Sequence, residues 1–486
     1  MKKINPWAGL LISFICIVLI QGSISQQPFD DAFITYRYAR NISNGLGFVY
    51  NYGEKVLGTT TPLFTLLLSL ISFIFQPEFL PRASFIISII ADTLNIWMIF
   101  RLSNSIFKDR GIAALTSLLF LLQPFRLNVA SGGMETSLFI TSLLFTYDRY
   151  IQGNRSLSTS IWAAVAFLIR PDAVIALIPI YADWFFHDKR DFLKSVLIAL
   201  LLISPWMIWS TFNFGSPIPN SVIAKSISYK NPPGHAALFL LTFIGTGTSG
   251  PYSSPFVLLP IILFGLPVLT IGSRVLLKQQ SRAMVIGFYP ILYTIVMILL
   301  NPSMIFSWYF IPLIPGMLIL TMGLIWYGLK ETRKIKLIIA SALSLILLVV
   351  PAFLLNKQPS SLLSRAREAA FWDACSFLSN HDLIDKVVLA PDIGVLGWCL
   401  EEAKILDPIG LVSPETIGYN KDLPPKQLVS LNLIIDKQPD YIISLDHFIN
   451  SNILENNDFQ KSYELIYETN VSIVDTKHLL YIFQRD

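Results

Sequence analysis

Directly after its first apolar run, the chain reads Asp30-Asp31-Ala32-Phe33-Ile34-Thr35-Tyr36-Arg37-Tyr38-Ala39-Arg40. Carboxylates that a membrane holds at its surface lose part of their solvation, so a pair of them needs a structural or a chemical reason. The meaning of this stretch therefore depends on whether the apolar runs around it cross a membrane.

The composition is that of a membrane protein. Of the 486 residues, 53% are hydrophobic and 14% are charged, whereas soluble proteins carry about 25% charged residues. The mean hydropathy is +0.58, and the net charge of +4 is too small to indicate binding of nucleic acid. We expect a mainly α, polytopic fold with about eleven spans, some of them shorter than the roughly 20 residues that cross a bilayer. They are predicted near residues 7–24, 84–102, 111–124, 135–150, 157–170, 173–187, 195–212, 255–272, 283–300, 308–329 and 336–355.

Positive charge sets the expected orientation, because cytoplasmic loops carry an excess of Lys and Arg. If the short apolar run at 63–75 is a juxtamembrane helix that starts at Pro62, all basic clusters fall on one side. These clusters are Lys2-Lys3, Arg101/Lys108/Arg110, Arg149/Arg155, Lys189/Arg190/Lys194, Arg274/Lys278/Arg282 and Lys330/Arg333/Lys334/Lys336. The N-terminus is then cytoplasmic. The first run lacks an Ala-x-Ala-like cleavage site and is expected to stay as a span in the inner, cytoplasmic membrane.

The chain changes character near residue 356. Residues 1–356 are predicted to form the transmembrane domain, with an outer loop at 25–62, whereas charges become frequent in residues 357–486. The second part is expected to be an extracytoplasmic α/β domain. It has an amphipathic helix at 364–380, strands at 386–390, 403–407 and 440–444, and an edge strand at 479–484. Cys375 and Cys399 lie in this domain and form either a disulfide or two buried free thiols.

Asp30 and Asp31 are the first candidates for chemistry. In the structural interpretation, one of them caps a helix that runs from residue 32 to 41. In the functional interpretation, one carboxylate is a base and the other orients an acceptor or a metal. Two like charges this close raise one pKa, and this suits a base.

The other candidates are charged residues of the outer loops. Glu135 opens a span, where a carboxylate meets a helix N-terminus favourably or contributes to a site. Arg170 and Asp172 either pair within a tight turn or act separately, Arg170 on a lipid phosphate and Asp172 on a substrate. Lys225 and Arg37 are further phosphate candidates. The alternatives for these two are a solvated lysine and a snorkelling arginine.

The sequence lacks the motifs of metal, phosphate-loop and dinucleotide sites. There is no cluster of metal ligands, no phosphate-binding loop and no dinucleotide-binding glycine pattern, and the five histidines are scattered. We therefore expect no cofactor or nucleotide, a divalent metal stays an open alternative, and a sugar donor, if one is used, is lipid-linked. Asp92 and Asn95 lie in a predicted span, where polar residues are candidates for a functional role. The alternative is that an interhelical hydrogen bond explains both.

The opening stretch, followed by Gly45-Leu46-Gly47-Phe48-Val49-Tyr50-Asn51, resembles bacterial polytopic glycosyltransferases of the GT-C class. The likeness is greatest to the mycobacterial terminal arabinofuranosyltransferases. The layout is also similar to the aminoarabinose transferases of lipid A and to protein O-mannosyltransferases. Further similar stretches are Gly133-Met-Glu135-Thr, Arg170-Pro-Asp172, Pro219 to Lys225, Asp392 to Gly397 and Asp407 to Leu411. The stretch Leu57 to Phe64 departs from the pattern, because the relatives often carry an acid and aromatics there.

The resemblance implies a polyprenyl-phosphate sugar as donor and a glycan, lipid or protein of the cell envelope as acceptor. It implies an inverting displacement on the outer face, either metal-independent or assisted by a divalent metal. The family's catalytic acid maps to Asp30 or Asp31, with Asp30 preferred. The outer cations would then hold the donor phosphate, and the remaining carboxylates would position the acceptor.

Two rival classes share the spans and the lipid partners. A transporter or flippase of lipid-linked sugars predicts polar residues along a path through the membrane and inverted repeats. A non-catalytic assembly subunit of a cell-envelope complex needs no carboxylate pair. The concentration of charge in the outer loops favours the transferase.

Overall fold

The computed structural model describes residues 6–23, 26, 28–153, 156–228, 234–235, 265, 267–300, 302, 305–330, 360–421, 423–424, 427–473 and 476–486. The predicted span at 336–355, most of the one at 255–272 and the domain boundary at 356 lie outside these residues. The chain forms two compact units. The first comprises residues 1–26, 84–205 and 233–358, and the second comprises residues 27–83, 206–232 and 359–486. The predicted division into two domains remains a prediction.

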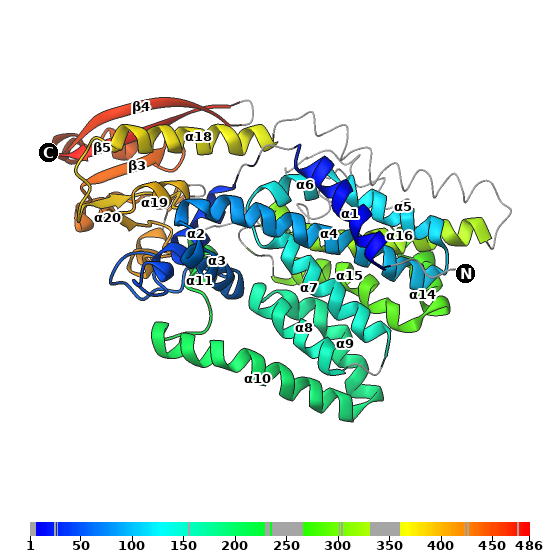
Figure 1. Cartoon of the computed structure of the whole chain (residues 1–486). Coiled ribbons are helices and arrows are strands. Elements are labelled where there is room, and N and C mark those ends of the chain that lie inside the picture. Colours follow the sequence, from blue (N-terminus) through cyan, green and yellow to red (C-terminus); the bar gives the residue numbers. More distant parts are fainter. Residues whose placement is uncertain are drawn as a thin grey trace. The chain divides into compact units, whose positions relative to one another are not determined.

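The membrane part of the chain is built from helices (Figure 1). They are α1 (Pro6–Gln21), α4 (Leu80–Phe107), α5 (Arg110–Leu121), α6 (Pro124–Ser131), α7 (Thr136–Ile151), α8 (Ser156–Ile169), α9 (Ala173–His187), α10 (Lys189–Phe214), α14 (Ser273–Gln279), α15 (Met284–Leu300) and α16 (Ile314–Lys330). Among them, α7 packs on α8, α9 packs on α15, and α15 packs on α16.

Several of these helices are long and apolar enough to cross a membrane. Among the described residues, they are Pro77–Phe107, Lys189–Phe214, Ser281–Leu300 and Ile311–Lys330. The pair Arg110–Leu121 and Phe125–Ser131, bent by 54°, counts as a further span if it is one broken helix. Four shorter apolar helices are Trp7–Gln21, Pro62–Ile74, Ser156–Ile169 and Ala173–His187. The polytopic helical fold is confirmed, and the number of eleven spans remains a prediction.

Two deep polar residues of α4 have partners within the first unit. Asp92 on α4 forms an ion pair with Arg126 on α6, and their side chains are 0% and 1% exposed. Asn95 donates to the Ser137 carbonyl at 3.0 Å and accepts from the Thr141 hydroxyl at 2.8 Å. The expected interhelical hydrogen bond, here from α4 to α7, is therefore present. The charge of Asp92 serves packing within the unit.

The second unit contains a five-stranded sheet of order β2-β1-β3-β5-β4. Its strands are β1 (Val387–Leu389), β2 (Lys404–Leu406), β3 (Tyr441–Leu445), β4 (Tyr463–Ile473) and β5 (Thr476–Arg485). The strands β2, β1 and β3 run parallel, whereas β5 is antiparallel to both β3 and β4. The predicted strands at 386–390, 403–407 and 440–444 and the α/β class are confirmed. The predicted strand at 479–484 is present within β5, but its predicted edge position is wrong, because β4 pairs with the open side of β5.

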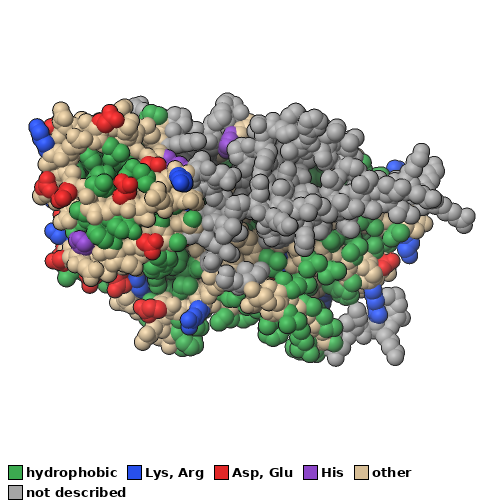
Figure 2. All heavy atoms as spheres, turned by 90° about the horizontal axis from the view of Figure 1, so that it is seen from above, with side chains coloured by type: hydrophobic (Ala, Val, Ile, Leu, Met, Phe, Trp, Pro, Cys, Tyr) green, Lys and Arg blue, Asp and Glu red, His purple; other side chains and the backbone are tan. Residues whose placement is uncertain are grey.

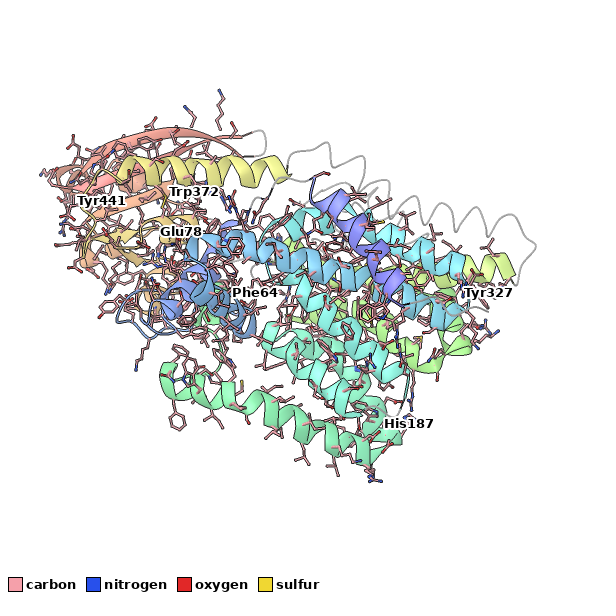
Figure 3. The ribbon with its side chains drawn as sticks, in the orientation of Figure 1. Phe64, Glu78, His187, Tyr327, Trp372 and Tyr441 are labelled. Carbon is pink, nitrogen blue, oxygen red and sulfur yellow. A yellow bond between two sulfur atoms is a disulfide. The ribbon has the colours of Figure 1, made fainter. Side chains whose placement is uncertain are left out.

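Helices flank this sheet and extend the second unit. They are α2 (Asp30–Ser43), α3 (Pro62–Ile74), α11 (Asn220–Ser228), α18 (Ser360–Leu378), α19 (Val395–Cys399), α20 (Leu431–Lys437), α21 (Ser451–Leu454) and α22 (Asn457–Ser462). The expected amphipathic helix is α18, which packs on β4. Figure 3 labels Trp372 on this helix and Tyr441 on β3. As predicted, α3 is a short apolar helix with Pro62 in its first turn.

The cysteines and the surface side chains also differ between the helical part and the part with the sheet. Cys375 on α18 and Cys399 at the end of α19 form a disulfide, so the alternative of two free thiols is excluded. Cys16 is the free cysteine. In Figure 2, acidic and basic side chains are scattered over the part that carries the sheet, whereas hydrophobic side chains cover much of the described helical surface.

Candidate functional site

Helix α2 is the scaffold of the candidate site. Nearly all of its side chains from Ala32 to Asn41 are buried, although the helix carries two arginines. Arg37 donates from Nε to the Tyr50 carbonyl at 2.9 Å, from Nη1 to the Gly397 carbonyl and from Nη2 to the Ala403 carbonyl at 3.1 Å. Its guanidinium also lies 4.5 Å from the centre of the Tyr50 ring. These bonds commit Arg37 to the backbone, which favours a structural role over phosphate binding.

The N-terminal part of α19 lies so close to Asp30 and Tyr50 that two of its residues must be glycine. A Cβ at Gly394 would clash with the Asp30 carbonyl oxygen, and one at Gly397 would clash with the Tyr50 hydroxyl. A larger residue at either position would therefore force α19 away from these neighbours. The segment Asp392 to Gly397, similar to GT-C sequences, is thus explained by this approach.

Asp30 is the point where the start of α19 meets α2. Its carboxylate accepts the backbone N–H of Gly394 at 3.0 Å and that of Val395 at 2.7 Å. Asp30 itself is the first residue of α2, and its side chain does not cap that helix. The predicted capping of the helix that follows is therefore not observed for Asp30. Its carboxylate instead holds the first N–H groups of α19.

Asp31 differs from Asp30 in its surroundings. Asp30 is 4% exposed, whereas Asp31 is only partly buried. Among the described residues, none donates a hydrogen bond to the Asp31 carboxylate. The pair thus consists of one anchored carboxylate and one more open carboxylate, which could act together on a substrate.

Two further acids and one arginine surround the pair. Arg367 on α18 lies 3.5 Å from Asp392 and 3.3 Å from its neighbour Glu368. The Glu368 carboxylate also accepts the backbone N–H of Asp30 at 3.3 Å. We call Asp30, Asp31, Arg367, Glu368 and Asp392 the acidic cluster. It holds four carboxyl groups and one guanidinium, so a proton or a cationic transition state is favoured there.

This environment shifts the proton affinity of Asp30. Burial, and after it the charge of Asp392, raises the pKa of Asp30 to about 7, while Arg367 and the Val395 N–H oppose the shift. The neighbouring Asp31 contributes least among these causes. The repulsion within the carboxylate pair therefore raises the pKa of Asp30 less than burial does. Burial also raises the pKa of Asp392 above its ordinary value, against the effect of Arg367. A carboxyl group with a pKa near neutrality is suited to act as a base at physiological pH.

Lys225 belongs to the same unit as the acidic cluster. It lies on α11 and is partly buried. The helix is fixed at both ends to the loop after β2: Asn220 donates to the Leu411 carbonyl at 3.2 Å, and Ser228 donates to the Ile409 carbonyl at 3.0 Å. Asp407 shapes that loop by accepting the N–H groups of Ile409, Leu411 and Val412. The backbone that carries Lys225 is therefore held in place.

The remaining candidates come together in the first unit. Arg170 binds Asp172 through Nε at 3.0 Å and through Nη2 at 2.6 Å. Its Nη1 lies 3.8 Å from Glu135 and has no hydrogen-bond partner among the described residues. The rings of Phe139 and Tyr309 lie 4.9 and 5.1 Å from the guanidinium. The pairing of Arg170 with Asp172 is thus present, and Glu135 joins it.

The sequence left Arg367, Glu368 and Asp392 unassigned as site residues. All three lie far along the chain from Asp30, and no spacing pattern links them to it. The signal that was available is the pair of glycines at 394 and 397. Closely spaced glycines next to an acid indicate a close approach of two backbones.

Two parts of the chain match models of protein families. Residues 58–209 match the family described as dolichyl-phosphate-mannose-protein mannosyltransferase. Residues 365–482 match a domain of unknown function, DUF8728. No curated protein sequence was found to match the chain.

Solved structures resemble the chain over nearly its whole length. The crystal structure of ArnT from Cupriavidus metallidurans in the apo state has a TM-score of 0.59 and 12% identity, with 98% of each chain covered. The structure of the same protein bound to undecaprenyl phosphate has a TM-score of 0.57 and 12% identity, covering 98% of this chain and 96% of that one. The arabinofuranosyltransferase AftD from Mycobacteria is similar at a TM-score of 0.41 and 13% identity, over 99% of this chain and 42% of the larger one.

The family match and the fold together confirm the resemblance to the GT-C class. The chain has a GT-C fold with a small C-terminal sheet domain, and it is a glycosyltransferase of the GT-C type.

Proposed function

We propose that this GT-C glycosyltransferase transfers a sugar from a polyprenyl-phosphate donor to a hydroxyl of a cell-envelope acceptor, on the outer face and with inversion. The observation that carries the proposal is Asp30, a carboxyl group whose pKa is raised to about 7 and which follows the first span directly. The bound undecaprenyl phosphate in the similar ArnT structure supports the class of donor.

In the proposed reaction, Asp30 removes the proton of the acceptor hydroxyl. The hydroxyl oxygen forms a bond to the anomeric carbon, the bond from that carbon to the phosphate oxygen breaks, and polyprenyl phosphate leaves. The transition state carries positive charge on the sugar ring, which the carboxylates of the acidic cluster stabilise. The Gly394 and Val395 N–H groups fix the orientation of Asp30, and each of its oxygens keeps a further lone pair.

The other candidates have supporting tasks in this proposal. Lys225 meets the phosphate that leaves, because an ammonium group stabilises the negative charge that develops there. Asp31 orients the acceptor. In the first unit, Glu135 and Asp172 hold Arg170, which is a candidate for binding a lipid phosphate.

The disulfide supports an outer location for the C-terminal residues. Disulfides persist in oxidising compartments and are rare in the cytosol, and Cys375–Cys399 ties α18 to α19 next to the acidic cluster. We therefore propose an inner-membrane protein with a cytoplasmic N-terminus and an extracytoplasmic C-terminal part.

The first test is transfer from a panel of radiolabelled polyprenyl-phosphate sugars, with the purified chain and a membrane extract as the source of acceptor. We expect labelled product from one donor and none from the others. Asp373→Asn, an exposed acid on α18, is the matched control and should retain full activity. Absence of product with every donor would contradict the proposal, and lipid scrambling in liposomes would then test the flippase.

Lys225→Gln should reduce kcat/KM for the preferred donor by about 10- to 100-fold, because a charge-assisted hydrogen bond contributes about 1.5–3 kcal/mol. Lys225→Arg, which keeps the charge, should recover part of the loss. Lys55→Gln is the control, since Lys55 is exposed in the same unit. Unchanged donor kinetics in Lys225→Gln would remove this residue from the phosphate site.

A further inference from the structure

A group of metal-ligating side chains lies at the end of the sheet. Asp446 and His447 follow directly on β3, and His478 lies on β5. The backbone N–H of Asp446 donates to the Leu479 carbonyl at 2.9 Å, which brings the turn after β3 against β5. One ligand atom from each of the three side chains lies within 4.8 Å of the others. The histidines are scattered in the sequence, so their spacing does not predict this group.

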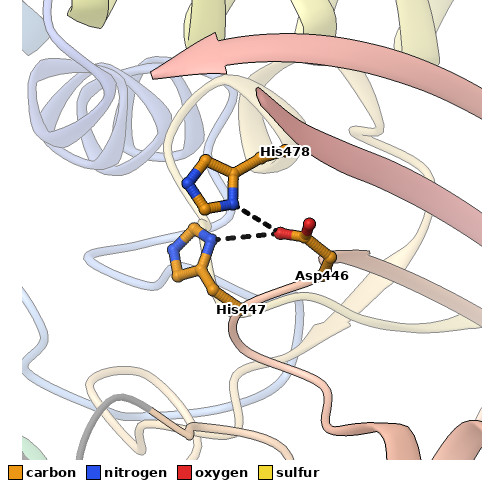
Figure 4. A group of neighbouring side chains, drawn as sticks. All are labelled: Asp446, His447 and His478. Atoms are coloured by element: carbon orange, nitrogen blue, oxygen red, sulfur yellow. Dashed lines mark hydrogen bonds and ion pairs between the residues drawn. The ribbon is translucent and has the colours of Figure 1, made fainter. Parts of the chain in front are cut away.

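The two rings face the same carboxylate oxygen (Figure 4). Nδ1 of His478 lies 2.7 Å from Oδ1 of Asp446, and Nδ1 of His447 lies 3.5 Å from that same atom. The ring centres of the two histidines are 4.7 Å apart. Two imidazoles and a carboxylate thus lie close together, two of them from the turn after β3 and one from β5.

A hydrogen bond between Asp446 and His478 explains only part of this arrangement. Nδ1 of His447 is buried and has no hydrogen-bond partner among the described residues, yet it points at the carboxylate from 3.5 Å. Neighbouring ligand atoms of a tetrahedral zinc ion lie about 3.3 Å apart, given bond lengths near 2.0–2.1 Å. The separation of His447 from Asp446 matches this distance. The shorter separation of His478 from Asp446 would open by about 0.6 Å when a metal replaces the hydrogen bond.

The group is open to solvent. All three side chains keep between 22% and 31% of their surface exposed, so an ion can enter from solvent.

We propose that Asp446, His447 and His478 form a binding site for a transition metal ion, with Zn²⁺ as the preferred ion. Two nitrogen ligands and one carboxylate suit zinc better than calcium or magnesium, which prefer oxygen ligands. Three protein ligands leave a fourth position for water or for a group of a bound molecule. The ion would join the end of β3 to β5. The proposal does not depend on the role of Asp30 as the base.

The test uses the full-length chain, purified in detergent through a tag without histidine and stripped with a chelator. Zinc is titrated in competition with a chromophoric chelator, and bound Co²⁺ is followed by its visible absorption. We expect about one zinc per chain at submicromolar Kd, a tetrahedral Co²⁺ spectrum and a higher melting temperature with zinc. His447→Ala and His478→Ala should each weaken zinc binding on the order of 100-fold.

His381→Ala is the matched control, because His381 also has a buried ring nitrogen but lies outside the group, with its ring centre 5.1 Å from that of Phe377. It should bind zinc like the unmodified chain. Asp446→Asn separates loss of zinc binding from loss of folding. Its amide can keep a hydrogen bond to His478, whereas the anionic ligand is lost. No zinc binding below about 100 µM, or equal binding in the two histidine variants and in the control, would overturn the proposal.

Discussion

Asp30→Asn is expected to reduce sugar transfer by about 10²- to 10⁴-fold, the usual contribution of a general base. The amide has nearly the shape of the carboxylate, and its oxygen still accepts one of the N–H groups of Gly394 and Val395. It cannot take a proton from an acceptor hydroxyl. Initial rates with the preferred donor, measured beside Asp31→Asn, give the comparison.

The pH dependence separates a base from a residue that only positions substrate. Because the pKa of Asp30 is raised to about 7, kcat/KM should rise with pH and level off above that value. Asp31→Asn should be slower but keep the same rise, since Asp31 contributes least to the shift. A rise that survives in Asp30→Asn, or that disappears only in Asp31→Asn, would transfer the base role to Asp31.

Loss of activity in Asp30→Asn should not reflect unfolding. The pKa of Asp30 is raised from 3.8 to about 7 on folding, so the folded state binds more protons than the unfolded state between these values. The contribution of Asp30 to stability is therefore favourable at low pH and is lost as pH rises through about 7. At pH 8 the variant lacks the cost of a buried charge, and its melting temperature should not fall below that of the unmodified chain by more than the loss of one hydrogen bond explains.

Local patterns predicted much of the fold. The apolar run behind Pro62 was too short for a span, and it forms α3. The short apolar strands between turn residues form the parallel part of the sheet. The strand β4 was missed because it mixes charged, polar and apolar residues, and its omission left β5 as a false edge. The position of a strand within a sheet depends on which partners cover it, and no single segment carries that information.

The site was predictable only in part. Asp30 and Asp31 were found because acids beside a span are unusual, whereas the shift of the Asp30 pKa comes mainly from burial under a loop that lies far along the chain. Arg37 shows the converse. An arginine on a juxtamembrane helix predicts phosphate binding or snorkelling, but here three backbone carbonyls accept its N–H groups, and two of them, those of Gly397 and Ala403, lie in a distant segment. Contacts between residues so far apart in sequence follow from the tertiary fold.

The largest effect on stability is expected for Arg126→Met in the first unit. The change leaves Asp92 without its ion pair at a position where its side chain is 0% exposed. Breaking a buried pair in this way costs about 3–5 kcal/mol. The variant also loses the bonds from Arg126 to the Phe120 and Leu121 carbonyls, at 3.0 and 2.8 Å, which cap the end of α5. Thermal unfolding in detergent should show a clear fall in melting temperature.

Arg101→Met is the control, because Asp148 keeps Arg149 at 3.6 Å and Gln152 at 2.7 Å when Arg101 is removed. Its cost should stay near 1 kcal/mol or less, since Arg101 is 37% exposed and exposed pairs contribute little. The double variant Asp92→Leu/Arg126→Met removes both buried charges and should recover most of the loss. Transfer activity should follow the folded fraction in all these variants, because the proposed chemistry does not use Asp92. A stable Arg126→Met variant that has lost activity would instead give Asp92 a role in moving ions or substrate, as the transporter hypothesis requires.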